Sequence, residues 1–581
     1  MKAPSNAPRS EQDKTFFDSL KVAIGNGPSF KGDVDYADET LEKYSHDASL
    51  FEIRPRVVVY PKDSEDVKTL VRWVNTRQTT VFKKASAAPA AIAGPVSDLS
   101  ITARSAGTDM SGGSINASII VDFTRYMNTI KKVTSTEGAV LPGCYYRDFE
   151  KETLKHGAIM PTYPASREIA AVGGMVGNNA GGEKSLKYGK TAAHVKELKV
   201  VFTDGHEYTV RALTPAELAA KIAQDDFEGR IYKQLSELIT ANRTVITAAA
   251  PTVSKNSAGY YLWNIWDEKT GTFDLCQLIV GSQGTLGLVT EITFSLVPVQ
   301  PYSNMLVVFL PELTHLSELI NEILPTGPDS IESYDDASMK LAIKFSFDFF
   351  KQLGFLPALK LGLQFIPDAW AVLVSGHIPK LIVMVEFEGA SETEIRQKLV
   401  SLKARIAHFG YKIHIARNSA EADKYWRIRR ESFNLLRKHT KGKKTAPFID
   451  DIIVEPAALP AFIPKIQALL DEYKLIYTIA GHPGNGNFHI IPLMDLGSPL
   501  SGDIILELSK KVYDLVHEYH GSITAEHNDG IIRTPYLLQM FGPAMISLFK
   551  ATKEIFDPRY ILNPGKKVGG TFEDIKKYIG K

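Results

Sequence analysis

The sequence predicts an α+β fold that is divided into two main parts. Dividing its 581 residues by the roughly 150 residues of a typical domain gives two to four domains. Before residue 300, short β-like runs are separated by glycine-rich loops, and the proline-containing segment 297–301 marks a boundary. From there to about residue 520, strand patterns such as 381–385 alternate with helix patterns such as 391–408 and 458–473. This mixture of short strands and helices indicates an α+β protein.

A βα unit is the first element that the pattern predicts. Residues 57–60 are rich in β-branched side chains, and an amphipathic helix follows from Ser64. An N-terminal tail is expected at 1–30 and a surface loop at 85–99. Three further strands, a C-terminal helix and an Asn-Pro-Gly turn are expected at 119–121, 198–202, 278–280, 543–556 and 563–565.

Composition and charge exclude several classes of protein. With 44% hydrophobic and 23% charged residues the chain is neither disordered nor collagen-like, and a net charge of +1 gives no broad footprint for nucleic acid. Two cysteines, Cys144 and Cys276, exclude a disulfide framework, a Cys-rich zinc ribbon and an iron–sulfur cluster held by four thiolates. Any metal must therefore use His, Asp or Glu. No signal peptide is visible, and a cytoplasmic location is expected.

Three glycine-rich loops suggest a cofactor held mainly by the backbone. They span 104–114, 173–182 and 281–287, each beside a strand-like run. The first is not a Walker A loop, because Gly113 stands where the lysine is required. The second fails the dinucleotide fingerprint, because Val172 stands at a glycine position. Each loop alone is better explained as a structural turn. Three in one region favour a large phosphate-bearing cofactor.

Histidines and a glutamate near the C-terminus form a second candidate site. In the segment 481–489, a glycine turn can bring His482 and His489 to one point, although an extended strand would place them roughly 23 Å apart. Glu526 and His527 follow in the segment 524–530. Two histidines and a glutamate can hold a divalent metal with open positions for substrate. Hydrogen-bonded structural histidines remain the alternative.

These motifs, taken together, resemble a known family of flavoproteins. The runs around 104–113, 164–189 and 281–291 are similar to the FAD-binding domain of the vanillyl-alcohol-oxidase/PCMH flavoproteins. Within that superfamily, the chain resembles the D-lactate, glycolate and D-2-hydroxyglutarate dehydrogenase branch from about Tyr44 to Lys566. The resemblance implies a two-part α+β FAD-binding domain, an antiparallel-sheet substrate domain, and a C-terminal tail that returns to the flavin.

The resemblance also implies a division of the chain and a set of cofactor contacts. The implied parts are a tail at 1–30, a PCMH-type FAD-binding domain at 31–300, a substrate domain at 301–520 with an insertion at 338–388, and a C-terminal segment at 521–581. The implied FAD contacts are Arg104, Ser105, Ala106, Gly107, Thr108, Asp109, Ser111, Gly112, Gly113, Pro164, Ser166, Gly173, Gly174, Asn178, Ala180, Gly182, Tyr188, Gly284 and Asn563. Relatives that attach FAD covalently through this loop carry His at the position of Thr108, so non-covalent FAD is expected. Gln283 replaces a commoner Glu, which we interpret as tuning.

Metal and substrate roles come from the same resemblance. It implies His482, His489 and Glu526 as ligands of a divalent metal, Zn or Mn, and His527 as the general base, with a reference pKa of about 6.5. Arg429 corresponds to the arginine of a Trp-x-x-Arg segment that binds the substrate carboxylate; a solvated basic helix face is the alternative. Lys255 and Asn256 are candidates for reaching the site. Three positions depart from the family pattern: Asn485 stands where Asp is common, and Ala525 and Asn528 stand where Gly is usual.

The implied reaction is oxidation of a D-2-hydroxy acid, with D-lactate as the expected substrate. Related proteins sometimes carry a fused iron–sulfur module after the Asn-Pro-Gly turn. With two cysteines, this chain is expected to pass electrons to a quinone, a separate electron-transfer protein or oxygen. Two alternatives stay open: a flavin-dependent transferase of the alkyl-ether-lipid synthase type, and a non-catalytic flavoprotein. The sequence does not report the oligomeric state.

The segment 338–388 holds the longest apolar stretches of the chain. Lysines and prolines interrupt them, so that no run approaches the roughly 18–20 residues of a transmembrane helix. Aromatic residues with interleaved lysines suit the headgroup region of a membrane, next to a quinone pool on its inner face. The alternative, which we favour, is an insertion that packs over the substrate domain. Peripheral membrane contact is therefore the second of two interpretations.

Overall fold

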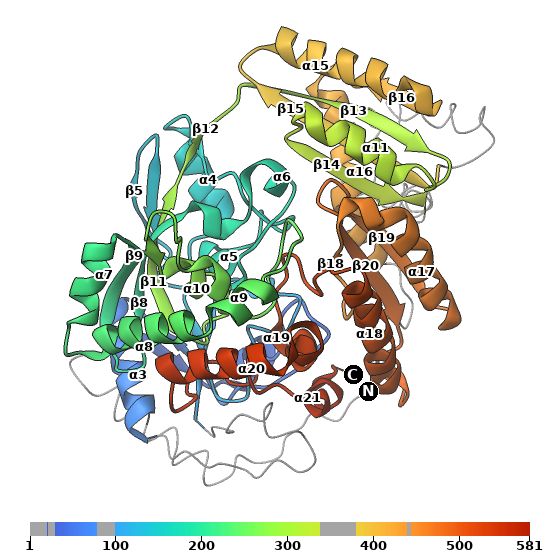
Figure 1. Cartoon of the computed structure of the whole chain (residues 1–581). Helices are drawn as coiled ribbons and strands as arrows, with labels where there is room; N and C mark the ends of the chain where they lie inside the picture. Colours follow the sequence, from blue (N-terminus) through green and yellow to red (C-terminus); the bar gives the residue numbers. More distant parts are fainter. Residues whose placement is uncertain (1–19, 21–29, 78–98, 337–378, 439–442, 581) are drawn as a thin grey trace.

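The protein has two large halves joined by its C-terminal segment (Figure 1). The structure is a computed structural model, and it describes Leu20 and residues 30–77, 99–336, 379–438 and 443–580. The predicted tail at 1–30 and loop at 85–99 lie almost wholly outside the described residues. Within those residues, no helix is long and apolar enough to cross a membrane.

The first half begins with a small sheet and one covering helix. β2 (Val57–Tyr60), β4 (Ile119–Asp122) and β3 (Ile101–Arg104) run parallel, and β1 (Asp33–Asp35) pairs antiparallel with β2. Helix α3 (Ser64–Arg77) buries Val67, Leu70, Val71 and Val74 in the same core as these strands. The predicted βα unit is confirmed, because its apolar helix positions recur at the spacing that faces a sheet.

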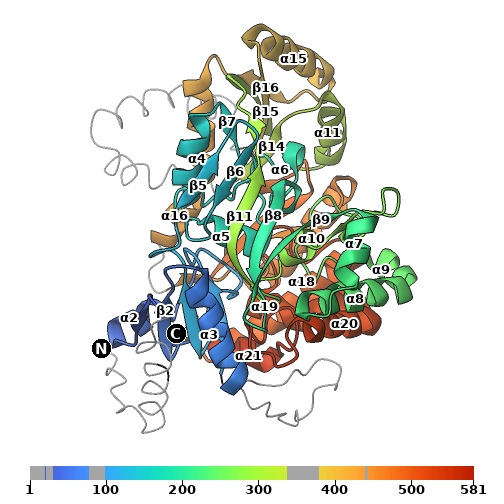
Figure 2. The same cartoon turned by 90° about the vertical axis from the view of Figure 1, so that its left-hand side faces the viewer.

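A six-stranded antiparallel sheet forms the second part of this half. Its order is β10 (Phe273–Asp274), β9 (Glu207–Leu213), β8 (Val195–Val201), β11 (Leu288–Ser295), β6 (Glu137–Val140) and β5 (Ile130–Val133). Along β11, buried and half-buried residues alternate strictly, as expected of a strand with one face in the core. β8 and β11 run side by side in Figure 2, beside helices α7 (Pro215–Ile222), α8 (Phe227–Ala241) and α9 (Arg243–Ala249).

One predicted strand is wrong. Residues 278–280 belong to the end of a helical turn, α10 (Cys276–Ile279), not to a strand. The Asp274 carboxylate accepts a hydrogen bond of 3.0 Å from the Cys276 amide at the start of this turn. Gly281, with φ +86°, then turns the chain into the third glycine loop. A short buried apolar run has no periodicity that separates strand from helix, so the sequence pattern did not decide it.

The second half consists of one antiparallel sheet and the helices that accompany it. The strand order is β16 (Lys412–Ile415), β13 (Tyr302–Leu310), β15 (Leu381–Gly389), β14 (Ser330–Asp335), β19 (Ile476–His482), β20 (Asn487–Met494) and β17 (Lys444–Thr445), with β18 (Ile452–Ile453) also on β20. The helices of this half are α11 (Leu316–Ile323), α15 (Glu392–Arg405), α16 (Ser419–Lys438), α17 (Leu459–Glu472) and α18 (Ser501–Glu518). The predicted α+β class with an antiparallel substrate-side sheet is confirmed.

The predicted insertion at 338–388 overlaps this sheet. Residues 381–388 form most of β15, which lies between β13 and β14 in the middle of the sheet. The rest of the predicted insertion, apart from 379 and 380, lies outside the described residues. The hypothesis that it touches a membrane therefore stays a prediction.

The C-terminal segment returns to the first half. Helix α20 (Leu537–Phe556) has a break at Gly542 (φ +73°) and lies along α8 (Figure 1). The chain then pairs with the small sheet: the Ile101 amide donates to the Ile561 carbonyl at 2.7 Å, and the Asn563 amide donates to the Ile101 carbonyl at 2.8 Å. Helix α21 (Phe572–Tyr578) follows. These bonds place the Asn-Pro-Gly turn directly beneath the first glycine loop.

Candidate active site

The three glycine loops line one pocket with an empty volume of about 800 Å³. The first loop follows β3, the second forms helix α5 (Val172–Asn178), and the third connects α10 to β11. Convergence of loops from three separate elements is the arrangement expected of a binding site for one large ligand.

Most of the predicted cofactor contacts line this pocket. They are Arg104, Ser105, Ala106, Gly107, Thr108, Asp109, Gly113, Gly173, Gly174, Asn178 and Gly284. The predicted contacts that lie outside its lining are Ser111, Gly112, Pro164, Ser166, Ala180, Gly182, Tyr188 and Asn563. Ser111 is part of the first loop, and its carbonyl accepts the Ile531 amide at 2.9 Å. The side-chain amide of Asn563 donates to the carbonyls of Gly113 and Gln283, both at 2.8 Å.

Two glycines of the second loop leave space that the protein does not fill. A Cβ atom built at Gly177 would meet no atom within 4 Å, and one at Gly174 would meet only the Ser105 Cβ at 3.8 Å. Packing within the protein therefore does not require glycine at either position, although both line the pocket. Missing side chains over open space are what a ligand needs when the backbone must approach it closely. The pocket thus fits a cofactor held by backbone groups.

Asp109 and Gln283 hold the three loops together. The Asp109 carboxylate accepts hydrogen bonds from the Ser111 amide at 3.0 Å, the Gly113 amide at 2.6 Å and the Asn178 side-chain amide at 2.7 Å. The side-chain amide of Gln283 donates to Ser111 Oγ and to Asn178 Oδ1, both at 3.2 Å. Its carbonyl accepts the Gly530 amide at 2.9 Å. Gln283 therefore uses both ends of its amide, and an ionised carboxylate could not supply the two donated hydrogen bonds.

The glycine turn between β19 and β20 brings His482 and His489 together. In this hairpin, Ala480 pairs with His489 and His482 pairs with Asn487, so the two histidines are diagonal neighbours on one face. Their Nε2 atoms lie 3.3 Å apart. Gly486 makes the turn possible, with φ +76°, and a Cβ there would lie 1.8 Å from the Val454 carbonyl oxygen.

Glu526 reaches the same point from the C-terminal segment. Its Oε1 lies 3.7 Å from the Nε2 of His482, and it accepts from the ammonium of Lys255 at 2.5 Å. Lys255, a candidate in the sequence, therefore does reach the site. A Cβ added at Gly181 would lie 2.8 Å from Glu526 Oε1, which shows how closely the second glycine loop approaches this cluster. The second glycine loop therefore lines the pocket with residues up to Asn178 and approaches the histidine cluster at Gly181.

These three side chains fit a divalent metal. Ligand atoms about 2.0–2.1 Å from one ion in a tetrahedral site lie roughly 3.3–3.4 Å apart, close to the spacing of the two Nε2 atoms. The Nδ1 of His482 contacts Glu332, and the Nδ1 of His489 lies 3.1 Å from Asp450 Oδ1. Carboxylates on both Nδ1 atoms leave both Nε2 lone pairs facing inward, as metal ligation requires.

Titration behaviour agrees with that role. Burial, together with the Lys255 ammonium, lowers the pKa of His482 well below its usual value, so that the imidazole is neutral. Burial opposes the charge of Glu526, but Lys255 and His482 lower the pKa of this carboxyl to about 2. A neutral histidine and an ionised carboxylate are the forms in which these side chains bind metal.

Asp451 lies close enough to be considered as a ligand, but its oxygens are already used. It groups with His489, Glu526 and His527, whose ligand atoms lie within 4.8 Å of one another. Its Oδ2 accepts three hydrogen bonds of 2.7 Å, from the hydroxyl of Thr524 and from the amides of Glu526 and His527. Its Oδ1 accepts from Asn487 at 3.2 Å. Asp451 therefore shapes the loop that presents Glu526 and His527.

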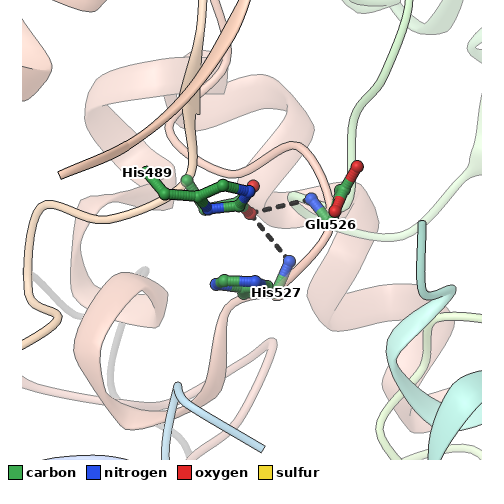
Figure 3. A group of neighbouring side chains, drawn as sticks. His489, Glu526 and His527 are labelled. Atoms are coloured by element: carbon green, nitrogen blue, oxygen red, sulfur yellow. Dashed lines mark hydrogen bonds between the residues drawn. The ribbon is translucent and has the colours of Figure 1, made fainter. Parts of the chain in front are cut away.

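His527 stacks on His489, with ring centroids 5.0 Å apart and an interplanar angle of 21° (Figure 3). Its Nδ1 lies 2.8 Å from Asp450 Oδ2. Burial opposes its protonation, but the carboxylates of Asp451 and Asp450 raise the pKa of His527 to about 9. The expectation of an ordinary pKa near 6.5 is therefore wrong for this structure, because the sequence did not reveal these two buried carboxylates.

Asn528 and Arg533 secure the loop that carries His527. Asn528 adopts φ +71°, a left-handed conformation that asparagine tolerates better than most residues. Its side-chain amide donates to the carbonyls of Asn178 at 3.1 Å and Gly281 at 2.9 Å, so it ties this loop to the second and third glycine loops. Arg533, which is fully buried, donates to the Asn528 carbonyl at 2.9 Å and the Asp450 carbonyl at 2.6 Å. Asparagine thus replaces glycine here without loss of the turn.

Arg429 lies at the histidine cluster and not on a solvated helix face. Its side chain, on α16, is only 12% exposed, and its Nε lies 3.4 Å from Glu332 Oε2. Glu332, on β14, contacts His482 through its other oxygen. The neighbouring Arg427 is exposed, while Arg430 forms a bidentate ion pair with Glu183 at 2.7 and 2.6 Å.

Sequence reasoning missed the carboxylates Glu332, Asp450 and Asp451. Burial raises the pKa of Glu332, while the Arg429 guanidinium and the Lys255 ammonium oppose that rise and favour the ionised carboxylate. All three side chains are at most 1% exposed. A usable signal was present for the aspartates, because two adjacent acids stand inside the apolar run 447–454. Acids buried in such a run need a partner.

Fold and site together define a flavoprotein class: a two-part nucleotide-cofactor domain, a separate antiparallel-sheet domain, and a histidine–carboxylate cluster between them. Two family models match the chain, the FAD binding domain over residues 93–211 and the C-terminal domain of FAD linked oxidases over residues 299–567. These matches place the chain among the FAD-linked oxidases.

Curated relatives and solved structures agree with this placement. D-2-hydroxyglutarate dehydrogenase of Pseudomonas putida is 28% identical over 549 residues, which is 92% of this chain and 50% of that protein. D-lactate dehydrogenase of Archaeoglobus fulgidus is 25% identical over 88% of this chain and 91% of its own length. The 4-ethylphenol oxidase of Gulosibacter chungangensis aligns with a TM-score of 0.65 at 14% identity, covering 97% of this chain and 99% of its own, and thus shares the fold. The chain spans about half the length of the first curated relatives that it matches.

Proposed function

We propose that this protein oxidises a D-2-hydroxy acid to the corresponding 2-oxo acid, with non-covalent FAD as the electron acceptor in the site. The observation that carries this proposal is the cluster of His482, His489 and Glu526 beside His527, where Glu526 is approached by Gly181 of the second of the three glycine loops that line the pocket. The matched relatives named D-2-hydroxyglutarate and D-lactate dehydrogenases support the same reaction type.

His482, His489 and Glu526 would hold the divalent metal, Zn or Mn. When bound there, such an ion supplies Lewis acidity toward the substrate oxygens. The residues of the three glycine loops would hold FAD, which would supply the acceptor for the Cα hydride. The chain's own residues do the rest of the work, which is to orient the substrate and to move its hydroxyl proton.

Arg429 and His527 have the two remaining roles. The Arg429 guanidinium suits a bidentate contact with the substrate carboxylate. The Nε2 of His527 faces away from Asp450 and is the atom that would take the hydroxyl proton. A divalent cation held beside His527 would add a like charge, which would lower the pKa of this imidazole from about 9 and favour its basic form.

We propose D-lactate as the substrate, and a quinone or a separate electron-transfer protein as the final acceptor. The test is anaerobic reduction of the bound flavin by a panel of D- and L-2-hydroxy acids, including lactate, glycolate and 2-hydroxyglutarate. Bleaching by D-lactate and not by L-lactate is the expected result. Bleaching only by D-2-hydroxyglutarate would assign that acid, and not D-lactate, as the substrate. The absence of bleaching by every acid tested would reject the proposal.

A further inference from the structure

Two buried carboxylates each contact one histidine of the metal cluster and one side chain that faces the substrate. Glu332 contacts Nδ1 of His482 with one oxygen, and its other oxygen lies 3.4 Å from the Arg429 guanidinium. Asp450 Oδ1 lies 3.1 Å from Nδ1 of His489, and Asp450 Oδ2 lies 2.8 Å from Nδ1 of His527. Glu332 and Asp450 therefore have equivalent positions, each between one histidine of the metal cluster and one further side chain.

These contacts form one continuous chain of polar groups. In order, its members are Arg429, Glu332, His482, His489, Asp450 and His527, joined in the middle by the 3.3 Å approach of the two Nε2 atoms. Glu332 is fixed in β14, between the strands β15 and β19. Asp450 is fixed by the bond of 2.6 Å from Arg533 to its carbonyl. Both carboxylates are buried, with Glu332 1% and Asp450 0% exposed.

We propose that Glu332 and Asp450 are positioning residues with separate tasks: Glu332 orients Arg429 for substrate binding, and Asp450 orients His527 for proton transfer. Both also fix the metal-binding tautomer of the histidine that they contact. This inference rests on the proposed function for the roles of Arg429 and His527. The part that concerns metal binding does not depend on the substrate.

The physical reason is that each carboxylate places one oxygen against each of two nitrogen groups, whereas an amide has only one acceptor oxygen. When a metal occupies the Nε2 atoms, His482 and His489 carry their protons on Nδ1, and each needs an acceptor there. In Glu332→Gln, one end of the amide can accept from His482, but the NH₂ end then faces the Arg429 guanidinium, donor against donor. In Asp450→Asn, the NH₂ end faces the Nδ1 proton of either His489 or His527. One of the two rings must then turn or change its tautomer.

The separate tasks predict different kinetic defects in the two variants. Both are expected to bind metal about 10–100-fold more weakly, the usual cost of losing such a supporting carboxylate. With saturating metal, Asp450→Asn should slow flavin reduction by at least about 100-fold at saturating substrate, since the general base is misoriented. Glu332→Gln should raise the substrate KM by about 10-fold or more, because a charged contact is lost, while the limiting rate of flavin reduction changes little.

The experiment measures zinc and manganese affinity of the metal-free FAD protein, and stopped-flow flavin reduction of the metal-loaded protein. Glu228→Gln is the matched control, because Glu228, on the remote helix α8, is a buried carboxylate that pairs with Lys221. This control should change neither the metal affinity nor the kinetics of flavin reduction. If a variant does not fold, Asp450→Glu and Glu332→Asp retain the charge and test the same contacts through their geometry.

Double variants decide whether the tasks are separate. Asp450→Asn should add little rate loss in a His527→Asn background, and Glu332→Gln should add little KM increase in an Arg429→Lys background, because partners that act as a unit are not additive. The crossed pairs should be additive. Equal losses of rate and KM in both variants would overturn the proposal, as would wild-type metal affinity in both. Failure of wild type itself to reduce flavin would reject the proposed function, while the metal titration would still test the two carboxylates.

Discussion

The Nε2 atoms of His482 and His489 lie 3.3 Å apart, and the Nδ1 atoms on the far sides of both rings face carboxylates. This relationship decides how the cluster can be charged. With protons on both Nδ1 atoms, two nitrogen lone pairs point at each other, which is unfavourable unless a cation lies between them. If the proposed metal site is correct, we expect the hairpin to gain stability when a metal binds.

Replacing either histidine should remove the metal. We expect His482→Ala and His489→Ala to contain less than stoichiometric metal and to lose nearly all turnover, while FAD stays bound because the glycine-loop pocket is separate. Elemental analysis and the flavin absorption spectrum measure both quantities. His206→Ala is the control, because His206 is exposed and its side chain contacts the nearby Asp204 and Tyr208. Active wild-type protein without stoichiometric metal would contradict this prediction.

Replacing His527 should separate metal binding from proton transfer. His527→Ala leaves His482, His489 and Glu526 in place, so metal content should stay near that of wild type. Flavin reduction should be slower by about 10²–10⁴-fold, the usual contribution of a general base. Stopped-flow absorbance under anaerobic conditions measures the rate. A loss smaller than threefold, with metal bound, would assign the proton transfer to another group.

The sequence predicted those contacts of the site whose residues are close together along the chain, and it missed those whose residues are far apart along the chain. The glycine turn sufficed to predict the meeting of His482 and His489, since only seven residues separate them. Glu332 is 150 residues from His482, and Asp450 is 39 residues from His489, so their contacts arise from the pairing of β14 with β19 and of β18 with β20. No local pattern encodes such pairings. The raised pKa of His527 follows from the same contacts and was missed for the same reason.

The predicted elements show a similar division. The strand at 57–60 and the helix from Ser64 were predicted because their apolar residues follow a clear period. The strand at 278–280 was wrong because that run is too short to show one. The convergence of three glycine loops on one pocket was inferred only from their number and their resemblance to a family.

FAD should be held without a covalent bond. Thr108 lines the pocket at the position where relatives with covalently attached FAD carry histidine. Threonine offers no nucleophilic nitrogen to the flavin ring. Precipitation of the holoprotein with acid should therefore leave the yellow colour in the supernatant. Colour retained in the washed pellet would contradict the prediction.

Gly177→Leu should block FAD binding without destabilising the metal-free, flavin-free protein. A Cβ at Gly177 meets no protein atom within 4 Å, so the new side chain enters the pocket and not the core. We expect FAD affinity to fall by at least about 100-fold and the Tm of the flavin-free protein to change little. Gly502→Leu is the control, since a Cβ there makes only ordinary contacts, of which the shortest is 3.4 Å, far from the pocket lining. Normal FAD content in Gly177→Leu would show that the cofactor does not occupy this space.

The last prediction concerns Gln283, which the sequence presents as a replacement for a commoner glutamate. In this chain its amide donates to Ser111 Oγ and to Asn178 Oδ1, and the carboxylate of Asp109 contacts the same two side chains. An ionised glutamate at position 283 would lose both donors and would place a second negative charge beside Asp109.

Gln283→Glu should therefore weaken FAD binding at neutral pH by about 10-fold or more, and the loss should shrink as the pH falls. The sign follows from protonation: below the pKa of the new carboxyl, which is about 4.3 when unperturbed and is raised by a neighbouring carboxylate, the protonated acid regains one donor. Wild-type affinity should not show this recovery, because the Gln283 amide does not titrate. FAD affinity of the flavin-free protein, measured by flavin fluorescence between pH 5 and pH 8, distinguishes the two. A Gln283→Glu variant that binds FAD like wild type at pH 8 would show that the three loops do not depend on this amide.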